Sequence, residues 1–355
     1  MKDGDAPAPN WPAIPIPIAA PSGELPVASE PLEALNRSLR EVALPPGTST
    51  IQFLRGSVLA LTTLSDVIRI SPEGKAQRIK GPSCEESFSP GLTIYPDYRA
   101  IMIEGGHLAL YGRLFRSGRG ESHLGYRSVQ TRGGWTCEGT HPPIDVSIAP
   151  GDVVWSVPTP HYPAELINDS RFVPSANLEG LVTAFYGRTA DRAWLAADGL
   201  EHLDGMSWSR VNHPFKEIKA LTEDPSGTLW VIGEREKQLF AGALPPNGDW
   251  IWIAAPPDFD ATFVIAASGE DVWFLGDKTF YQYDGRVLRS MPAPLHSPTA
   301  WVGAAGEIWV GGADPSGAVV GEDPLQGRDT RVGKLLRIEA SVTANSAAVD
   351  GRSVQ

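Results

Sequence analysis

Short apolar runs alternate with polar turns along this chain, and the unit that they form recurs. In the stretch EDPSGTLWVIGE, residues 223–234, a polar turn stands before an apolar run that contains Trp230. The same slot is filled in six further units by Ala60, Met102, Trp155, Trp194, Trp273 and Trp309. The units recur at roughly 40 residues, which is the period of a four-stranded propeller blade.

Each unit predicts four strands. An apolar run rich in small residues precedes the strand that contains the Trp230 position. This run suits the innermost strand, where backbones crowd together. A third run often closes on Asp-Gly, and a fourth ends near proline, which suits an outer edge. In the second unit the pattern predicts strands at 91–96, 99–106 and 107–112.

The last unit lacks a fourth strand, and residues 40–47, REVALPPG, match that pattern ahead of the first unit. We therefore predict an all-β fold, a seven-bladed β-propeller of four-stranded blades, closed by an N-terminal strand that completes the last blade. The propeller spans residues 40–340.

Three segments lie outside the predicted ring. Residues 1–27 are rich in proline and predict an extended tether. Residues 28–39 place Leu32, Leu35 and Leu39 on one face of a short helix. Residues 341–355 are small and polar and predict a loose tail.

The stretch EDPSGTLW, together with RAWLAADGLEHLDG, resembles the repeats of two-component regulator propellers. The resemblance covers units four to seven and implies a propeller of the sensory or binding type. TEDPSGTLW is also similar to the Asp-box of sialidases, although two residues separate Asp224 from Gly227 where that box has one. We interpret Asp224 as a turn-forming residue, because Asp-Pro-Ser-Gly favours a turn.

The formal net charge is −12. This acidity argues against nucleic acid as a partner, which would need a basic surface. No apolar run reaches the roughly 20 residues of a spanning helix, so no membrane insertion is expected. The N-terminal residues also lack the apolar core of a signal peptide. The expected location is the cytoplasm, or the periplasm or cell surface if Met1 replaces a removed signal, and the expected state is a monomer.

A basic segment interrupts this acidic chain at residues 113–132, which we expect to be an insertion in unit two. Arginine forks bind carboxylates and phosphates, and aromatic rings add a stacking surface. The segment therefore predicts binding of an acidic peptide or another anionic ligand, although a solvated hairpin is the alternative. Its candidate binding residues are Arg113, Arg116, Arg119, His123, Tyr126, Arg127 and Arg132.

Two other connections exceed what a propeller hairpin needs. Unit three contains SVPTPHYPAEL with His161 and Tyr162, and unit seven contains GGADPSGAVVGEDPLQGRDTR. Long loops on a rigid ring are common recognition sites, although tolerated insertion is the alternative. Cys84 and Cys137 follow or lie in neighbouring outer strands and could form a disulfide.

No catalytic residue, metal site or nucleotide motif can be assigned, and the seven histidines lack metal-ligand spacing. We expect a non-catalytic binding or scaffold module that recognises another protein or a ligand and needs no cofactor. A divalent metal in the central channel stays open. One alternative is a propeller hydrolase or lyase acting on a glycan or lactone at the channel mouth, and another is a detached sensory domain.

Overall fold

The computed structural model describes residues 33–34, 39–53, 59–62, 66–71, 74–82, 94–104, 107–116, 124–140, 146–149, 153–156, 164–166, 171–173, 182–205, 207–302, 306–317, 319–323 and 328–338. Every regular element in these ranges is a β-strand. None of the described segments forms a helix that could cross a membrane. The strands form seven sheets of four or five strands and one sheet of two.

The first three sheets are antiparallel and follow the chain in order. The first consists of β3 (Ile51–Phe53), β4 (Leu59–Thr62), β5 (Val67–Ile70) and β6 (Ala76–Ile79). The second consists of β7 (Ile94–Glu104), β8 (His107–Arg116), β9 (Leu124–Thr131) and β10 (Gly134–Thr140). The third consists of β11 (Val146–Ala149), β12 (Val153–Ser156), β13 (Ala164–Leu166) and β14 (Arg171–Val173).

The next three sheets repeat this order. The fourth consists of β15 (Ala184–Thr189), β16 (Arg192–Ala196), β17 (Leu200–Asp204) and β18 (Ser207–Val211). The fifth consists of β19 (Glu217–Glu223), β20 (Leu229–Arg235), β21 (Gln238–Leu244) and β22 (Ile251–Ile253). The sixth consists of β23 (Ala261–Ser268), β24 (Asp271–Gly276), β25 (Thr279–Tyr283) and β26 (Leu288–Pro292), with β1 (Glu33–Ala34) added beside β26.

The last sheet joins the two ends of the described chain. It consists of β27 (His296–Val302), β28 (Ile308–Ala313), β31 (Gly333–Ile338) and the early strand β2 (Leu39–Glu41). β2 pairs antiparallel with β31, so that Leu39 lies opposite Ile338. The small sheet of β29 (Val319–Asp323) and β30 (Arg328–Arg331) is inserted between β28 and β31.

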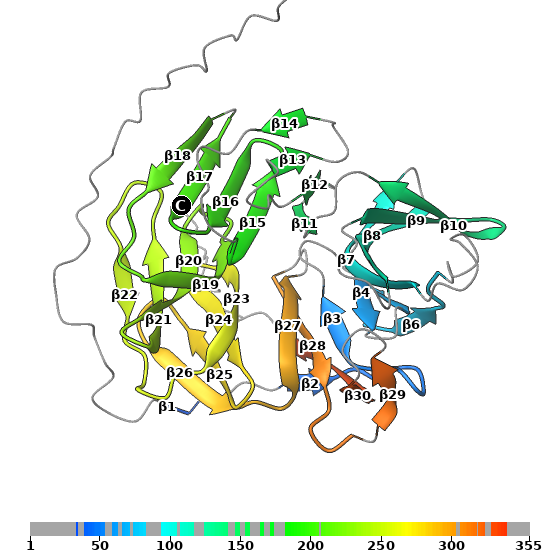
Figure 1. Cartoon of the computed structure of the whole chain (residues 1–355). Coiled ribbons are helices and arrows are strands. Elements are labelled where there is room, and N and C mark those ends of the chain that lie inside the picture. The colour runs from blue at the N-terminus through cyan, green and yellow to red at the C-terminus, as the bar shows by residue number, and fades with distance from the viewer. Residues whose placement is uncertain are drawn as a thin grey trace, which may run out of the picture.

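The sheets lie around a common centre, as in a propeller (Figure 1). First strands of successive sheets contact one another, as β15 does with β19, β19 with β23, β23 with β27, and β27 with β3. The first strands are therefore the innermost ones, and the last strand of each sheet lies outermost. An all-β propeller with four-stranded antiparallel sheets agrees with the sequence pattern.

The core lies between the sheets, and the tryptophan slot supplies much of it. Trp230 packs with residues of the sixth sheet, Trp273 with residues of the seventh, and Trp309 with Ile51 and Phe53 of the first. These three indoles are 0 to 4% exposed. Each tryptophan therefore fills the space between its own sheet and the next one, and Trp309 fills the space between the last and the first.

The second sheet corrects the strand prediction. The described parts of the runs predicted as separate strands at 91–96 and 99–106 belong to one strand, β7, so Met102 lies in a first strand rather than in the second-strand slot. Residues 107–112 belong to the second strand, β8, rather than to a third. The segment at 113–132 is not an inserted loop, because the end of β8 and the whole of β9 occupy most of it.

The predicted helix at 28–39 is wrong where the structure describes it. Glu33 and Ala34 form β1, which pairs parallel with β26, and Leu39 begins β2. The remaining residues of that segment lie outside the described ranges. A helix of about a dozen residues is marginal on its own, and the sheet edges here supply backbone hydrogen-bond partners instead.

Candidate binding face

The connections between strands distinguish two sides of the ring. Second strands end and third strands begin on one side, where each sheet is also entered from the preceding one; we call this the long-connection side. On the other side, first strands turn into second strands and third into fourth; we call this the tight-turn side. The distinction follows from antiparallel pairing within each sheet and from the parallel arrangement of innermost strands in a propeller.

Three unusually long connections fall on the long-connection side. They join β8 to β9 across residues 117–123, β12 to β13 across 157–163, and β28 to β31 across 314–332. The last of them contains the β29–β30 hairpin, where Val319 is 54% exposed. The segments that the sequence marked as recognition loops therefore start and end on the same side.

Innermost strands are distorted near both sides. Register shifts at the ends of β15 and β23 lie near the tight-turn side, and three others lie near the long-connection side. A register shift between Ile218 and Ala220 leaves Lys219 as an extra residue in β19, and a shift in β23 does the same for Thr262. In β27, Ser297 and Pro298 stand against one residue of β28. Bulges re-aim side chains and are frequent beside binding sites.

The bulge in β27 holds a strained backbone. Ser297 has a φ of 49°, in the left-handed region that non-glycine residues rarely adopt. Its N–H donates to Asp277 Oδ1 of the neighbouring sheet at 2.6 Å. Strain of this kind persists where surrounding contacts fix it, and it concentrates at functional sites.

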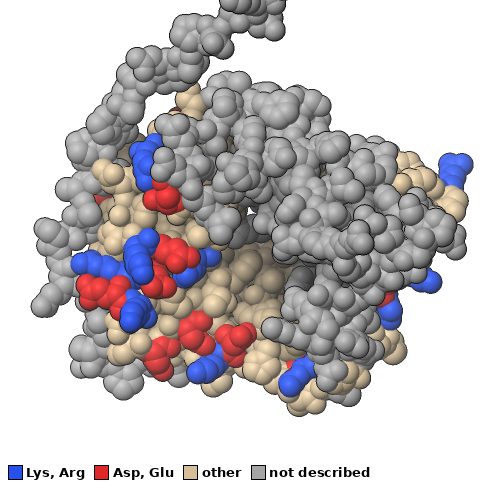
Figure 2. Space-filling model, viewed as in Figure 1, with Lys and Arg blue, Asp and Glu red and all other residues tan. Residues whose placement is uncertain are grey.

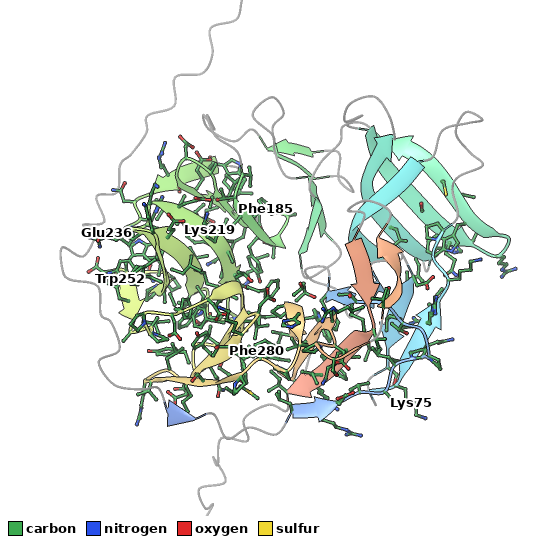
Figure 3. The ribbon with its side chains drawn as sticks, turned by 60° about the horizontal axis from the view of Figure 1, so that its bottom comes forward. Lys75, Phe185, Lys219, Glu236, Trp252 and Phe280 are labelled. Atoms are coloured by element: carbon green, nitrogen blue, oxygen red, sulfur yellow. The ribbon has the colours of Figure 1, made fainter. Side chains whose placement is uncertain are left out.

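Charges on the fifth sheet are balanced rather than of one sign. Lys219 Nζ lies 2.7 Å from Glu217 Oε1 and 3.7 Å from Glu234 Oε2. The hydrogen bond that Lys219 donates to Glu217 is the main cause that raises the pKa of Lys219. Figure 2 shows acidic and basic atoms side by side over this part of the ring. Figure 3 places Lys219 closer to the centre of the ring than Glu236.

The arginines of segment 113–132 do not form one cluster. Arg116 ends β8 on the long-connection side, whereas the exposed Arg132 lies in the β9–β10 turn on the tight-turn side. The seven steps of β9 separate these ends by roughly 23 Å. The register places Asp97 opposite Arg113 and Glu138 opposite Arg127. Two of the arginines thus have an acidic cross-strand neighbour, which the local count of charges missed.

The remaining candidate residues divide between described and undescribed parts. Tyr126 lies in β9, opposite Gly112 and Gly139. Arg119, His123, His161 and Tyr162 lie outside the described residues. Cys137 lies in β10 and is disulfide-bonded. Its predicted partner Cys84 also lies outside the described ranges, so their pairing stays a prediction.

The tight-turn side carries short turns that carboxylates hold together. Asp224 is fully buried, and its Oδ1 accepts from the Ser226 and Thr228 amides at 2.8 and 3.1 Å. Its Oδ2 accepts from Trp230 Nε1 at 3.0 Å. Gly227 completes this turn with a φ of 90°. Asp224 is a turn-forming residue, as the sequence predicted.

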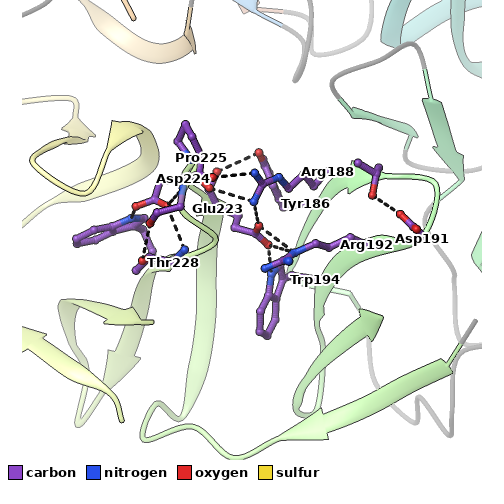
Figure 4. A network of polar contacts seen from close by, with 12 residues as sticks. Tyr186, Arg188, Asp191, Arg192, Trp194, Glu223, Asp224, Pro225 and Thr228 are labelled. Carbon is purple, nitrogen blue, oxygen red and sulfur yellow. Dashed lines mark hydrogen bonds and ion pairs between the residues drawn. The ribbon is translucent and has the colours of Figure 1, made fainter. Parts of the chain in front are cut away.

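Glu223 beside it joins two sheets (Figure 4). Its carboxylate accepts from Arg188 Nη1, from Arg192 Nε at 3.1 Å and from Trp194 Nε1 at 2.7 Å, all three from the fourth sheet. The Glu223 side chain is fully buried, so these contacts replace water around its charge. This arrangement holds the fourth and fifth sheets together.

A second buried carboxyl, Glu201 of β17, is less well satisfied. It lies opposite Arg210, and its Oε2 accepts no hydrogen bond from any described residue. Burial raises the pKa of Glu201 to about 7, which Arg210 partly opposes. The neighbouring His202 stacks on Trp194 with ring centroids 4.0 Å apart, and burial together with Arg192 lowers its pKa. Both groups lie within the sheet rather than at the channel mouth.

Replacing Glu201 by Gln should stabilise the protein at alkaline pH. A carboxyl whose pKa is higher in the folded state than its usual 4.5 destabilises the fold as pH rises from about 4.5 to about 7. The variant should therefore gain on the order of 2–3 kcal/mol over the parent at pH 8 and nothing at pH 4. Urea unfolding at both pH values measures this. A gain of equal size at pH 4 would point to packing instead of titration.

No protein-family model and no curated protein matches this sequence. Among solved structures, it is similar to virginiamycin B lyase from Staphylococcus aureus, with 12% identity, a TM-score of 0.57, and coverage of 85% of this chain and 99% of the other. A catalytically inactive form of that lyase with quinupristin gives 14% identity, a TM-score of 0.55, and coverage of 84% and 98%. At such identities the likeness shows the β-propeller fold alone.

Proposed function

We propose that this protein is a non-catalytic β-propeller binding module that captures a partner on its long-connection side. The observation that supports this is the unequal length of the connections. Three of those between second and third strands are long, whereas turns on the other side, such as 190–191, 224–228 and 269–270, are short. Recognition residues commonly lie on long loops that a rigid scaffold positions.

The proposal includes a ring of seven blades, each being one of the sheets of four or five strands, with β2 closing the last blade. A closed ring gives the long connections a fixed base, because β2 completes the last blade from the other end of the chain. The bulges at Lys219, Thr262 and Ser297 would then border the mouth of the channel on the same side. The repeats favour a relationship to two-component regulator propellers as the source of this architecture.

The proposed partner is acidic, either a protein segment or an anionic ligand. Arg116 ends β8 on the long-connection side. Arg119 follows it in the sequence, within the connection to β9 and outside the described residues, and we propose that both arginines contact the partner. Arg113 and Arg127 are less available for this role, because acidic residues stand opposite them in the sheet. The likeness to a lyase concerns the fold and does not favour lyase chemistry.

Replacing Arg116 and Arg119 by Ser should weaken capture of the partner at least about tenfold, because each charge-assisted contact contributes about 1.5–3 kcal/mol. The partner is first identified by affinity capture and mass spectrometry, and its Kd is then measured for both proteins. The matched control is Arg132→Ser, which removes an exposed arginine on the tight-turn side. Equal weakening by the control, or unchanged binding of the double variant, would refute the assignment of the binding side.

A further inference from the structure

The outer strand of the fifth sheet, β22, is an apolar edge. It consists of Ile251, Trp252 and Ile253, and it is the terminal strand of its sheet. Ile251 is 49% exposed. Other described outer strands include charged or polar residues, as in β6 (AQRI) and β18 (SWSRV). Exposed edges without charge or proline invite pairing with another strand, so native proteins usually cover them.

The neighbouring sheet shows how such an edge is covered here. β1 pairs parallel with β26, with Glu33 opposite Arg289 and Ala34 opposite Ser290. The chain therefore already adds a strand from its N-terminal region to an outer edge of the ring. Glu33, the first described residue, thus lies at the outer margin of the sixth sheet, which contacts the fifth. Figure 3 places Trp252 at the outer margin of the ring, where an added strand would lie.

The N-terminal region contains a segment suited to a sheet edge. Residues 13–18 read Ala-Ile-Pro-Ile-Pro-Ile, so isoleucine and proline alternate strictly. In a strand, successive backbone N–H groups point to opposite edges, and successive side chains point to opposite faces. Ile14, Ile16 and Ile18 would direct their N–H groups to one edge, while Pro15 and Pro17 would leave the other edge without donors.

This alternation fits an outermost strand. The isoleucine edge can pair with a blade, and the proline edge cannot receive a further strand, which protects the sheet against edge-to-edge association. The isoleucine side chains emerge on one face and can cover apolar surface beside Ile251. The 14 residues between Ile18 and Glu33 can extend to about 45 Å, which is ample to reach an adjoining sheet.

We propose that residues 13–18 of this chain pair with the free edge of β22 as a fifth strand of that sheet. The occupant is the chain's own N-terminal segment, as β1 is on β26. The consequence is that two consecutive sheets are covered by one continuous N-terminal strap. This inference concerns the outer margin of the ring and is independent of the binding proposed for the long-connection side.

The test is hydrogen exchange of the full chain, followed by mass spectrometry of peptides spanning residues 249–255. Replacing Ile14, Ile16 and Ile18 by Ser should accelerate exchange of the outward amides of β22 at least about tenfold. The control, Pro15→Ala with Pro17→Ala, keeps the isoleucine edge and should leave this exchange unchanged. The melting temperature of each protein verifies that the ring itself stays folded.

Two results would overturn the proposal. Identical exchange of the β22 amides in the unsubstituted protein and in the variant with Ile14, Ile16 and Ile18 replaced by Ser would show that this segment does not cover β22. Protection that rises with protein concentration, together with a dimer in sedimentation, would show that a second copy covers the edge instead. A peptide of residues 10–21 added to the isoleucine variant should restore protection if the pairing is direct.

Discussion

Deleting residues 1–44 is expected to unfold the protein at a markedly lower temperature, because it removes the outer strand of the last sheet. β2 pairs with β31 through Leu39, Arg40 and Glu41, and the Val42 amide donates to Leu335 O at 2.9 Å. Val42 is 8% exposed and packs near Trp309. Burial of such side chains contributes about 1.5–3 kcal/mol each, and each hydrogen bond about 0.5–1.5 kcal/mol.

The expected loss is about 4–8 kcal/mol, which is comparable to the whole stability of a typical domain. Urea unfolding followed by tryptophan fluorescence measures it. The matched deletion of residues 1–27 keeps β1 and β2 and should cost far less. If both deletions unfolded at the same urea concentration, β2 would not be what joins the two ends of the ring.

The repeating units could be found from sequence because each sheet repeats one local pattern. Trp194, Trp230 and Trp273 occupy second strands, as the pattern indicated. The turn at Asp224 could also be predicted from its residues alone. In the second sheet, the same kind of local pattern predicted the wrong strand positions. The pattern predicted separate strands at 91–96 and 99–106, yet Pro96 lies inside β7. β7 is a terminal strand of its described sheet, and proline is tolerated in such strands.

The contacts between sheets could not be predicted in the same way. Glu223 meets Arg188 and Arg192 only after two sheets have packed, and no local spacing marks these partners. The basic segment at 113–132 shows the same limit, because along the chain its positive charges have few acidic neighbours. In the sheet, Asp97 and Glu138 stand opposite two of its arginines. Sequence patterns report what neighbours along the chain do, whereas charge pairing is decided by neighbours in space.

Replacing Glu223 by Ala is expected to be among the most destabilising single substitutions on the tight-turn side. It removes the acceptor of Arg188, Arg192 and Trp194 at once, and it leaves two guanidinium groups without their buried counter-charge. Removing one partner of a fully buried ion pair costs about 3–5 kcal/mol. The Arg188 and Arg192 side chains keep 27% and 34% exposure, so water can partly replace Glu223 and the expected cost is about 3 kcal/mol, at the lower end of that range. Urea unfolding of the parent and the variant measures this difference in the free energy of unfolding.

The matched control is Glu236→Ala, because Glu236 also faces an arginine but in water. Its side chain is 81% exposed and lies 3.9 Å from Arg235, so its loss should change stability by less than about 0.5 kcal/mol. Glu223→Gln separates shape from charge, since it retains an oxygen for Trp194 while removing the negative charge. If Glu223→Ala cost no more than Glu236→Ala, the bonds from Arg188 to Asp224 O and Pro225 O, together with apolar contacts, would suffice to hold the fourth and fifth sheets together.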